Sequence, residues 1–325
     1  MINRSIPAFA AAAVALAIGV AGCGSGGESD ASSGSSSGSD QELAGTIRID
    51  GSSTVFPFAE AAGELFNEEQ PGVKVTVGQS GTGGGFEKFC AGETDVSTAS
   101  RPIKEDEEAP VCEKAGVKYE EVQVANDGIA VVTNKNVAVD CLTVDQLKAI
   151  WEPNSKVANL ADAGDGLPSS PVKLFGPGTD SGTFDFFTKE INGEEGASRE
   201  DYEASEDDNQ LVTGVAGTEG GLGYFGYSYY EQNADKLNLV AVGADEASCK
   251  KPDATSIQDG SYKPLSRPLF MYPSDKALAR PEVKAFMEFV VNNYADIAKA
   301  SQIVAMTDAQ AAESKTEVDK LAGVN

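Results

Sequence analysis

The sequence predicts an α/β fold with mainly parallel strands, and two observations support that prediction. Strand-like and helix-like segments alternate along the 325-residue chain, which is typical of strands joined by helical crossovers. Three times, a strand-like run ends in a stretch of Ser, Thr and Gly at which a helix begins. Because 41% of the residues are hydrophobic, the chain can bury a core large enough for one two-lobed body or two ordinary domains.

The expected elements begin at residue 45. Alternating apolar residues and turn signals predict strands over 45–50, 71–79, 94–100, 122–134 (interrupted at 126–128), 171–176 and 236–242, and either a buried strand or a strand followed by a turn over 221–232. Helical spacing predicts helices around 58–66, within 80–92, over 143–151, across 184–191 and over 281–300. Ser53 or Thr54 is expected to cap the first of these helices, and Pro57 suits its first turn.

The N-terminal segment has the features of a secreted protein. Residues 1–22 carry Arg4 and then an apolar stretch, as a signal peptide does. The signal ends in "VAGC", which resembles the lipobox of bacterial lipoproteins and implies that Cys23 is lipidated; the alternative is a chance cysteine after an ordinary signal. Residues 23–44 are expected to form a lipid-anchored flexible tether, because they contain almost no apolar side chain.

The body of the chain is expected to be soluble and extracytoplasmic. Beyond residue 40, no apolar run approaches the roughly 20 residues that a spanning helix needs. Four cysteines remain there, namely Cys90, Cys112, Cys141 and Cys249. In an oxidising compartment an even number predicts two disulfides, for which three pairings are open. No metal site is expected, because the chain has no histidine and no CxxC spacing.

Charge excludes one class of partner. The net charge is -26 over the full chain. Residues 1–40 contribute one positive and three negative side chains, which leaves about -24 on the body. Nucleic acid is therefore not an expected partner. Any anionic ligand must be held by local dipoles and hydrogen bonds against this unfavourable global field.

The three Ser/Thr/Gly runs predict an anion-binding site. They are "DGSSTVFP" (50–57), "SGTGGGF" (80–86) and "DSGTF" (180–184). Helix N-termini expose unpaired N–H groups and the positive end of the helix dipole, and hydroxyls add further donors. Ligands of open α/β sheets bind at the carboxyl ends of the strands, so the three runs can act together. The alternative is that each run only caps its helix.

Ser181 is also a candidate catalytic nucleophile. A serine hydrolase of the usual kind needs an imidazole base, and this chain contains no histidine. Ser181 also lacks an SxxK or GxSxG context. The sequence therefore favours a binding protein over an enzyme, with no catalytic residue and no cofactor.

Five motifs carry a family resemblance. "GSSTVFP", "GTGGGF", "STASRPI", "GPGTDSGTFDFF" and "GYFGYSYYE", in this order behind a lipobox, resemble the phosphate-binding lipoproteins of bacterial ABC transporters, the PstS family. The resemblance implies a two-lobed periplasmic-binding-protein fold, type II-like, with a ligand cleft between the lobes. Lobe one would comprise 45–132 plus 264–325, and lobe two 133–263. Pairing Cys90 with Cys112 and Cys141 with Cys249 would keep each disulfide within one lobe.

The resemblance also assigns ligand contacts. The three binding turns of the family map onto Ser53, Thr54 and Val55, onto Thr82 and Gly83, and onto Ser181, Gly182 and Thr183. Val55 is expected to contribute only its backbone N–H. Ser100, at the end of the third expected strand, is a further expected ligand contact.

This sequence departs from the best-known members at two charged positions. Pro177 stands where they place an arginine, and Arg101 follows Ser100 where they place an aspartate. We expect Arg101 to be the charged phosphate contact, because a guanidinium fork suits two phosphate oxygens; the alternative is that it pairs with a surface carboxylate. Asp127 is the candidate carboxylate that accepts the ligand's proton, unless it is an ordinary turn residue.

The function that the resemblance implies is capture of inorganic phosphate and its delivery to an ABC-transporter permease. The protein is expected to be a monomer that is anchored to the bacterial cell membrane through Cys23. Three alternatives remain open at this point: a binding protein for sulfate or another tetrahedral oxyanion, a secreted phosphatase or hydrolase that uses Ser181, and a phosphate sensor or surface antigen without a transport role.

Overall fold

The computed structural model describes residues 42–179, 181–321 and 323. The expected signal peptide, the lipidation site Cys23 and nearly all of the expected tether lie outside the described residues. Asp180, in the third Ser/Thr/Gly run, lies outside them as well.

The strands form one ten-stranded sheet. Along its main path the order is β2 (Val73–Val77), β1 (Gly45–Gly51), β3 (Val96–Ala99), β10 (Ser266–Pro273), β4 (Val122–Asn134), β8 (Gly221–Gly226), β6 (Lys173–Pro177) and β7 (Glu203–Ser205). Off this path, β9 (Leu237–Gly243) pairs with β4 and with β5 (Cys141–Thr143).

Helices connect and cover the strands. They are α1 (Phe56–Glu69), α2 (Gly81–Cys90), α3 (Ala109–Ala115), α4 (Val144–Trp151), α5 (Gly182–Phe187), α6 (Asp208–Gly217), α7 (Tyr227–Glu231), α8 (Ala254–Gln258), α9 (Asp275–Leu278), α10 (Pro281–Asn292), α11 (Tyr294–Ala300) and α12 (Asp308–Leu321). Three short helices of other types are η1 (Leu160–Ala163), η2 (Thr188–Asn192) and η3 (Glu246–Ser248). The expected helix across 184–191 is divided into α5 and η2, and the expected helix over 281–300 into α10 and α11. A strand along the whole of 221–232 is wrong, because β8 ends at Gly226 and α7 follows it. Helices α3, α6, α8, α9 and α12 were not predicted from the sequence.

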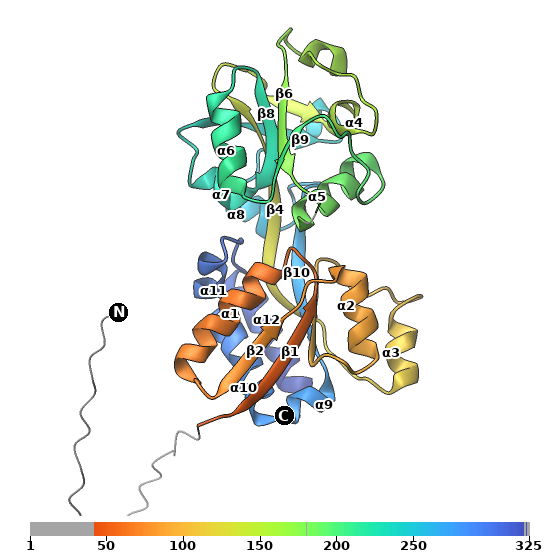
Figure 1. The fold of residues 1–325 in the computed structure, drawn as a ribbon, viewed down its shortest axis with the longest axis vertical. Helices are drawn as coiled ribbons and strands as arrows, with labels where there is room; N and C mark the ends of the chain where they lie inside the picture. The colour runs from red at the N-terminus through yellow and green to blue at the C-terminus, as the bar shows by residue number, and fades with distance from the viewer. Residues whose placement is uncertain (1–41, 180, 322, 324–325) are drawn as a thin grey trace, which may run out of the picture. The chain divides into compact units, whose positions relative to one another are not determined.

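The described residues form four hydrophobic clusters, and the largest cluster of each lobe is its main core. The core of lobe one is formed by residues between 47 and 125 and between 269 and 318, and includes Phe58 and Phe286. The core of lobe two is formed mainly by residues between 129 and 265. There Trp151 meets the stacked rings of Phe187 and Tyr224, whose centroids are 3.7 Å apart. The strands β4 and β10 connect the lobes (Figure 1).

Strand β4 changes partners where it passes from one lobe to the other. Its residues 122–128 pair with β10, and its residues 129–134 pair with β8 and β9. The expected interruption at 126–128 is wrong, because the strand is continuous there. Both crossing strands are antiparallel to all of their partners, whereas the outer pairs such as β1 with β2 and β6 with β8 are parallel. The sheet is therefore mixed, since the chain leaves lobe one on β4 and returns on β10.

Both expected disulfides are present, Cys90 with Cys112 and Cys141 with Cys249. The first joins the end of α2 to α3, and the second ties β5 to the segment after η3. Among the described residues, no helix is both long and apolar enough to cross a membrane.

Candidate functional site

A cleft of about 680 Å³ lies between the lobes. Lobe one, lobe two and the β10 crossover all contribute to its lining. Seven of the predicted site residues line it, namely Ser53, Thr54, Thr82, Gly83, Ser100, Arg101 and Gly182. The other four, Val55, Asp127, Ser181 and Thr183, are not among the described lining residues.

The first turn leaves its hydroxyl groups available. Helix α1 begins after Val55, with no side-chain cap, so the expectation that Ser53 or Thr54 caps it is wrong. Val55 is fully buried, and its N–H donates to the carbonyl of Ser52 over 3.2 Å. Neither hydroxyl caps α1, and both Ser53 and Thr54 line the cleft, where Thr54 Oγ1 accepts a hydrogen bond from Arg267.

The second turn joins α2 to the end of β3. Helix α2 begins after Ser80 without a side-chain cap. The hydroxyl oxygens of Thr82 and Ser100 lie 3.1 Å apart, and the N–H of Ser100 donates to Thr82 Oγ1 over 3.2 Å. Two hydroxyls from different elements are thus held side by side on the wall of lobe one.

The third turn combines a cap with a close approach between the lobes. Ser181 caps α5, because its Oγ accepts a hydrogen bond from the N–H of Thr183 over 3.2 Å. Gly182 faces lobe one so closely that an added Cβ would overlap Thr54 Oγ1 and lie 2.5 Å from the Thr54 nitrogen. Only glycine fits this contact between the two lobes.

Arg267 is the charged residue that the sequence analysis missed. It lies on β10 directly opposite Asp127 of β4, and its Nε is 3.2 Å from Asp127 Oδ2. Its Nη2 donates to Thr54 Oγ1 over 2.7 Å and to the carbonyl of Gly182 over 3.1 Å. The guanidinium carbon lies 3.9 Å from the ring centroid of Phe186. One arginine on the crossover therefore contacts both lobes.

The surroundings of Arg267 hold a positive charge inside the cleft. Only 12% of its side chain is exposed, and this burial lowers the pKa of Arg267, an effect that the nearby Asp127 carboxylate opposes. An arginine remains protonated in spite of such a shift. Asp127 forms this ion pair through Oδ2 and is not among the described residues that line the cleft.

Arg101, the predicted cation, is held differently. Its two terminal nitrogens each donate to one carboxylate oxygen of Glu108 over 2.8 Å. These bonds raise the pKa of Arg101. Its side chain is 36% exposed at the rim of the cleft. The structure thus shows the arrangement that was considered as the alternative, an arginine paired with a carboxylate.

Asp185 supplies a carboxylate to the cleft lining from α5. Burial, together with the negative charges of Glu195 and Glu206, raises its pKa to about 6, although Arg267 opposes this rise. Asp185 is therefore a carboxylate that takes up a proton more readily than an exposed one. No feature of the local sequence marks Asp185, because its surroundings come from residues distant in the chain.

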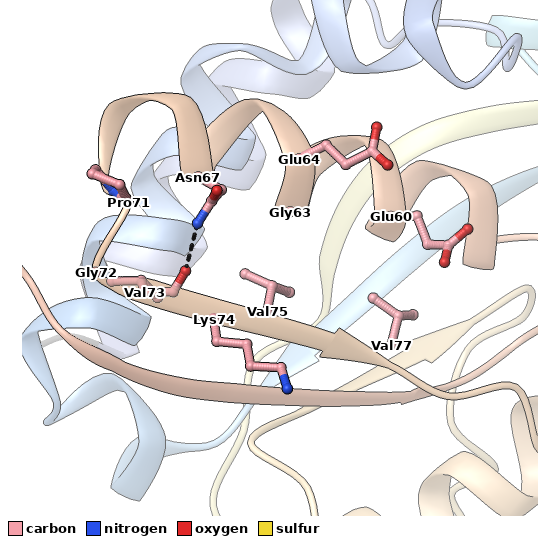
Figure 2. A pocket seen from close by; sticks show the side chains of 10 residues that line it. All are labelled: Glu60, Gly63, Glu64, Asn67, Pro71, Gly72, Val73, Lys74, Val75 and Val77. Atoms are coloured by element: carbon pink, nitrogen blue, oxygen red, sulfur yellow. Dashed lines mark hydrogen bonds between the residues drawn. The ribbon is translucent and has the colours of Figure 1, made fainter. Parts of the chain in front are cut away.

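A second groove lies on lobe one between α1 and β2, and has a volume of about 410 Å³ (Figure 2). Glu60 and Glu64 project from α1 along it, and Val75 and Val77 line its opposite side. The described lining contains these two carboxylates and one cation, Lys74, so its charge does not favour an anion. The candidate anion site is therefore the cleft between the lobes.

The fold and the cleft define a two-lobed α/β binding protein whose ligand site lies between its lobes. Over residues 32–293 the sequence matches the family described as PBP superfamily domain. It is 41% identical over 281 residues to the phosphate-binding protein PstS of Staphylococcus saprophyticus, and the match covers 86% of each chain.

Solved structures agree with these matches. One, described as a possible phosphate binding protein from Planctomyces limnophilus, superposes with a TM-score of 0.79 at 43% identity, covering 86% of this chain and 99% of that one. Another, from Clostridium perfringens, is assigned as a phosphate ABC transporter substrate-binding protein and contains phosphate. It superposes with a TM-score of 0.57 at 28% identity, and the match covers 81% of this chain and 100% of that one. The chain belongs to the PBP superfamily and, within it, to the PstS family of phosphate-binding proteins.

Proposed function

We propose that this protein captures inorganic phosphate outside the cytoplasm and delivers it to the permease of an ABC transporter. The observation that carries the proposal is a cleft between the lobes that is lined by Gly182 of lobe two and by the hydroxyl-rich turns of lobe one, and that contains the buried cation of Arg267. The names of the relatives support phosphate as the ligand and an ABC transporter as the partner.

The chemistry of the lining suits a small tetrahedral oxyanion. The hydroxyls of Ser53, Thr54, Thr82 and Ser100 offer neutral donors, and Gly83 allows a ligand to approach the backbone at the start of α2. A guanidinium that is already oriented by a carboxylate loses little freedom when it binds an oxyanion. We assign the charged contact to Arg267, and we keep Arg101 as a contact at the rim.

Ser181, Gly182 and Thr183 remain proposed contacts from lobe two. Because Ser181 Oγ already accepts the cap bond from Thr183, its hydroxyl proton remains available for a ligand. Val55 remains a proposed backbone contact, although its N–H donates to Ser52 in this arrangement. Asp185 replaces Asp127 in our proposal as the carboxylate that accepts the proton of the ligand.

The proposed protein is a monomeric binding protein that catalyses no reaction and uses no cofactor. Lipidation of Cys23 would anchor it to the membrane, and the tether would leave the two lobes free to meet the permease. Binding between the lobes and release by hinge opening are the usual motions of such two-lobed proteins.

Calorimetric titration of the phosphate-depleted protein tests the proposal. We expect phosphate to bind in a 1:1 ratio and sulfate to bind more weakly. A titration in which sulfate binds more tightly than phosphate would contradict the choice of ligand. Incubation with a phosphate monoester should release no inorganic phosphate, and turnover that disappears in Ser181→Ala would instead support an enzyme.

A further inference from the structure

The segment between α11 and α12 makes a third connection between the lobes. It begins at Gln302, whose φ of 57° lies in the left-handed region that glutamine rarely adopts. Val304 then packs into the core of lobe two, although both flanking helices belong to lobe one. The N–H of Asn126 on β4 donates to the carbonyl of Val304 over 2.8 Å. The segment is thus attached to the crossover strand itself.

Three amide side chains connect this segment to lobe two, namely Asn126, Gln258 and Gln310. We call these three side chains, together with the backbone carbonyls that they contact, the rear clasp. Gln258, at the end of α8 in lobe two, donates from Nε2 to the carbonyl of Ala305 over 2.9 Å. Gln310, in α12, donates back to the carbonyl of Gln258 over 3.0 Å. Asn126 Nδ2 donates to Gln310 Oε1 and to the Ala305 carbonyl, each over 3.2 Å.

The rear clasp lies on the side of β4 away from Arg267. Successive side chains of a strand point to opposite faces, so Asn126 and Asp127 face opposite ways. Asp127 holds Arg267 on the cleft side, and Asn126 holds the rear clasp on the other side. A rotation about β4 and β10 that opened the cleft would change the spacing between the lobes on this rear face. Hydrogen bonds lose their strength at distorted distances and angles, so the rear clasp belongs to the closed arrangement.

We propose that Gln258 and Gln310 are positioning residues that favour closure of the lobes and thereby set the affinity for phosphate without touching the ligand. This proposal rests on the proposed function of phosphate binding. When only a fraction of the protein is in the closed form, the apparent dissociation constant rises in inverse proportion to that fraction. The rear clasp therefore acts on affinity through the population of closed molecules.

The test uses the full-length protein with the variants Gln258→Ala and Gln310→Glu. Gln310→Glu keeps an acceptor for Asn126 and loses the donor to Gln258. Each variant should raise the apparent Kd for inorganic phosphate about three- to tenfold, mainly through faster release. Small-angle scattering should show a larger radius of gyration for the ligand-free variants than for the ligand-free wild type, and equal radii at saturating phosphate.

Ser314→Ala is the matched control. Ser314 lies on the same helix, α12, and its hydroxyl donates to the carbonyl of Gln123 over 2.7 Å, which is a contact within lobe one. This control should lower the melting temperature and leave the phosphate affinity unchanged. If the clasp variants lower the melting temperature but keep the wild-type affinity and radius, the clasp is only structural and the proposal is wrong. Failure of the wild type to bind phosphate would overturn the proposed function, whereas the scattering of ligand-free protein still tests the clasp.

Discussion

Two arginines line the same cleft, one on the crossover strand β10 and the other just after β3 in lobe one. Arg267 is 12% exposed, stacks on Phe186 and donates to both lobes. Arg101 is 36% exposed and directs its fork at Glu108 within its own lobe. A charge in a buried environment interacts more strongly with a ligand than one at a solvated rim, because water screens the latter.

The comparison indicates that the fold, and not the motif in which an arginine lies, sets the partners of that arginine. Arg101 lies within "STASRPI", which resembles a binding segment of the family, yet its fork is already occupied by a carboxylate. Arg267 lies in a run that resembled no binding motif, yet it reaches Thr54 and Gly182 at once.

The largest expected effect comes from Arg267→Gln. This change removes the buried cation and leaves Asp127 unpaired, so the phosphate Kd should rise at least about 30-fold, which is about 2 kcal/mol. Calorimetric titration measures it. Arg199→Gln is the control, since Arg199 is also buried and paired with a carboxylate, Asp201, but does not line the cleft among the described residues. If both variants bind phosphate like the wild type, Arg267 is not the charged contact.

Gly182→Ala should have the second-largest effect. The new Cβ would press against Thr54 and hold the lobes apart at the point that Arg267 bridges. Overpacking of about 1–3 kcal/mol predicts roughly a tenfold weaker affinity for phosphate. Gly217→Ala on α6 is the control, because nothing lies within 4 Å of a Cβ added there. Equal affinities of the two variants would show that this contact does not limit closure.

Asp185→Asn tests the electrostatics on the Arg267 side of the cleft. The pKa of Asp185 is raised from 3.8 to about 6, so the folded state binds more protons than the unfolded state between these values. Ionisation of Asp185 therefore destabilises the fold increasingly as the pH rises through this window. The variant should melt at a higher temperature than the wild type above pH 6, and the gain should vanish below about pH 4.

Asp201→Asn is the control, because it should change the melting temperature in the opposite direction. Hydrogen bonds from Arg199 lower the pKa of Asp201, so that variant should lose stability at neutral pH. A gain for Asp185→Asn that is the same at pH 4 and pH 7 would show that the carboxylate is not destabilised by its surroundings. Thermal melts at a series of pH values measure both.

Arg101→Ala should have the smallest effect on affinity. A partly exposed ion pair contributes about 0–1 kcal/mol, so the phosphate Kd should change less than about fivefold. Glu108→Gln sharpens the test, because it frees the fork of Arg101 and should tighten binding if Arg101 reaches the ligand. A large loss of affinity in Arg101→Ala would reverse our order of the two arginines.

Much of the fold could be predicted from local patterns. The helix expected over 143–151 is present as α4, and Thr143 caps it, because its Oγ1 accepts a hydrogen bond from the N–H of Gln146 over 3.2 Å. The strands around 45–50 and 236–242 are present as β1 and β9. Strand β10 was missed, because Pro268 interrupts its apolar run and a strand's partners lie far away in the sequence. Helix α12 was missed because its surface is mostly polar.

The site could be predicted only in part. The turns at Ser53, Thr82 and Gly182 were found because each follows a strand and opens a helix. Arg267 could not be found, because only the antiparallel register of β10 and β4 places it opposite Asp127. The pKa of Asp185 likewise depends on Glu195, Glu206 and Arg267, which approach it through the fold.

The sequence by itself determined the α/β class, the absence of a histidine base and the turns rich in neutral donors, because composition and local periodicity encode these features. The tertiary structure alone places Arg267 between the lobes in contact with both of them, and Arg101 at the rim against Glu108. These positions depend on burial and on partners up to 213 residues apart, as for Arg267 and Thr54, and no local pattern records such distances. The same holds for the rear clasp, in which Asn126 meets Gln310 across 184 residues of sequence.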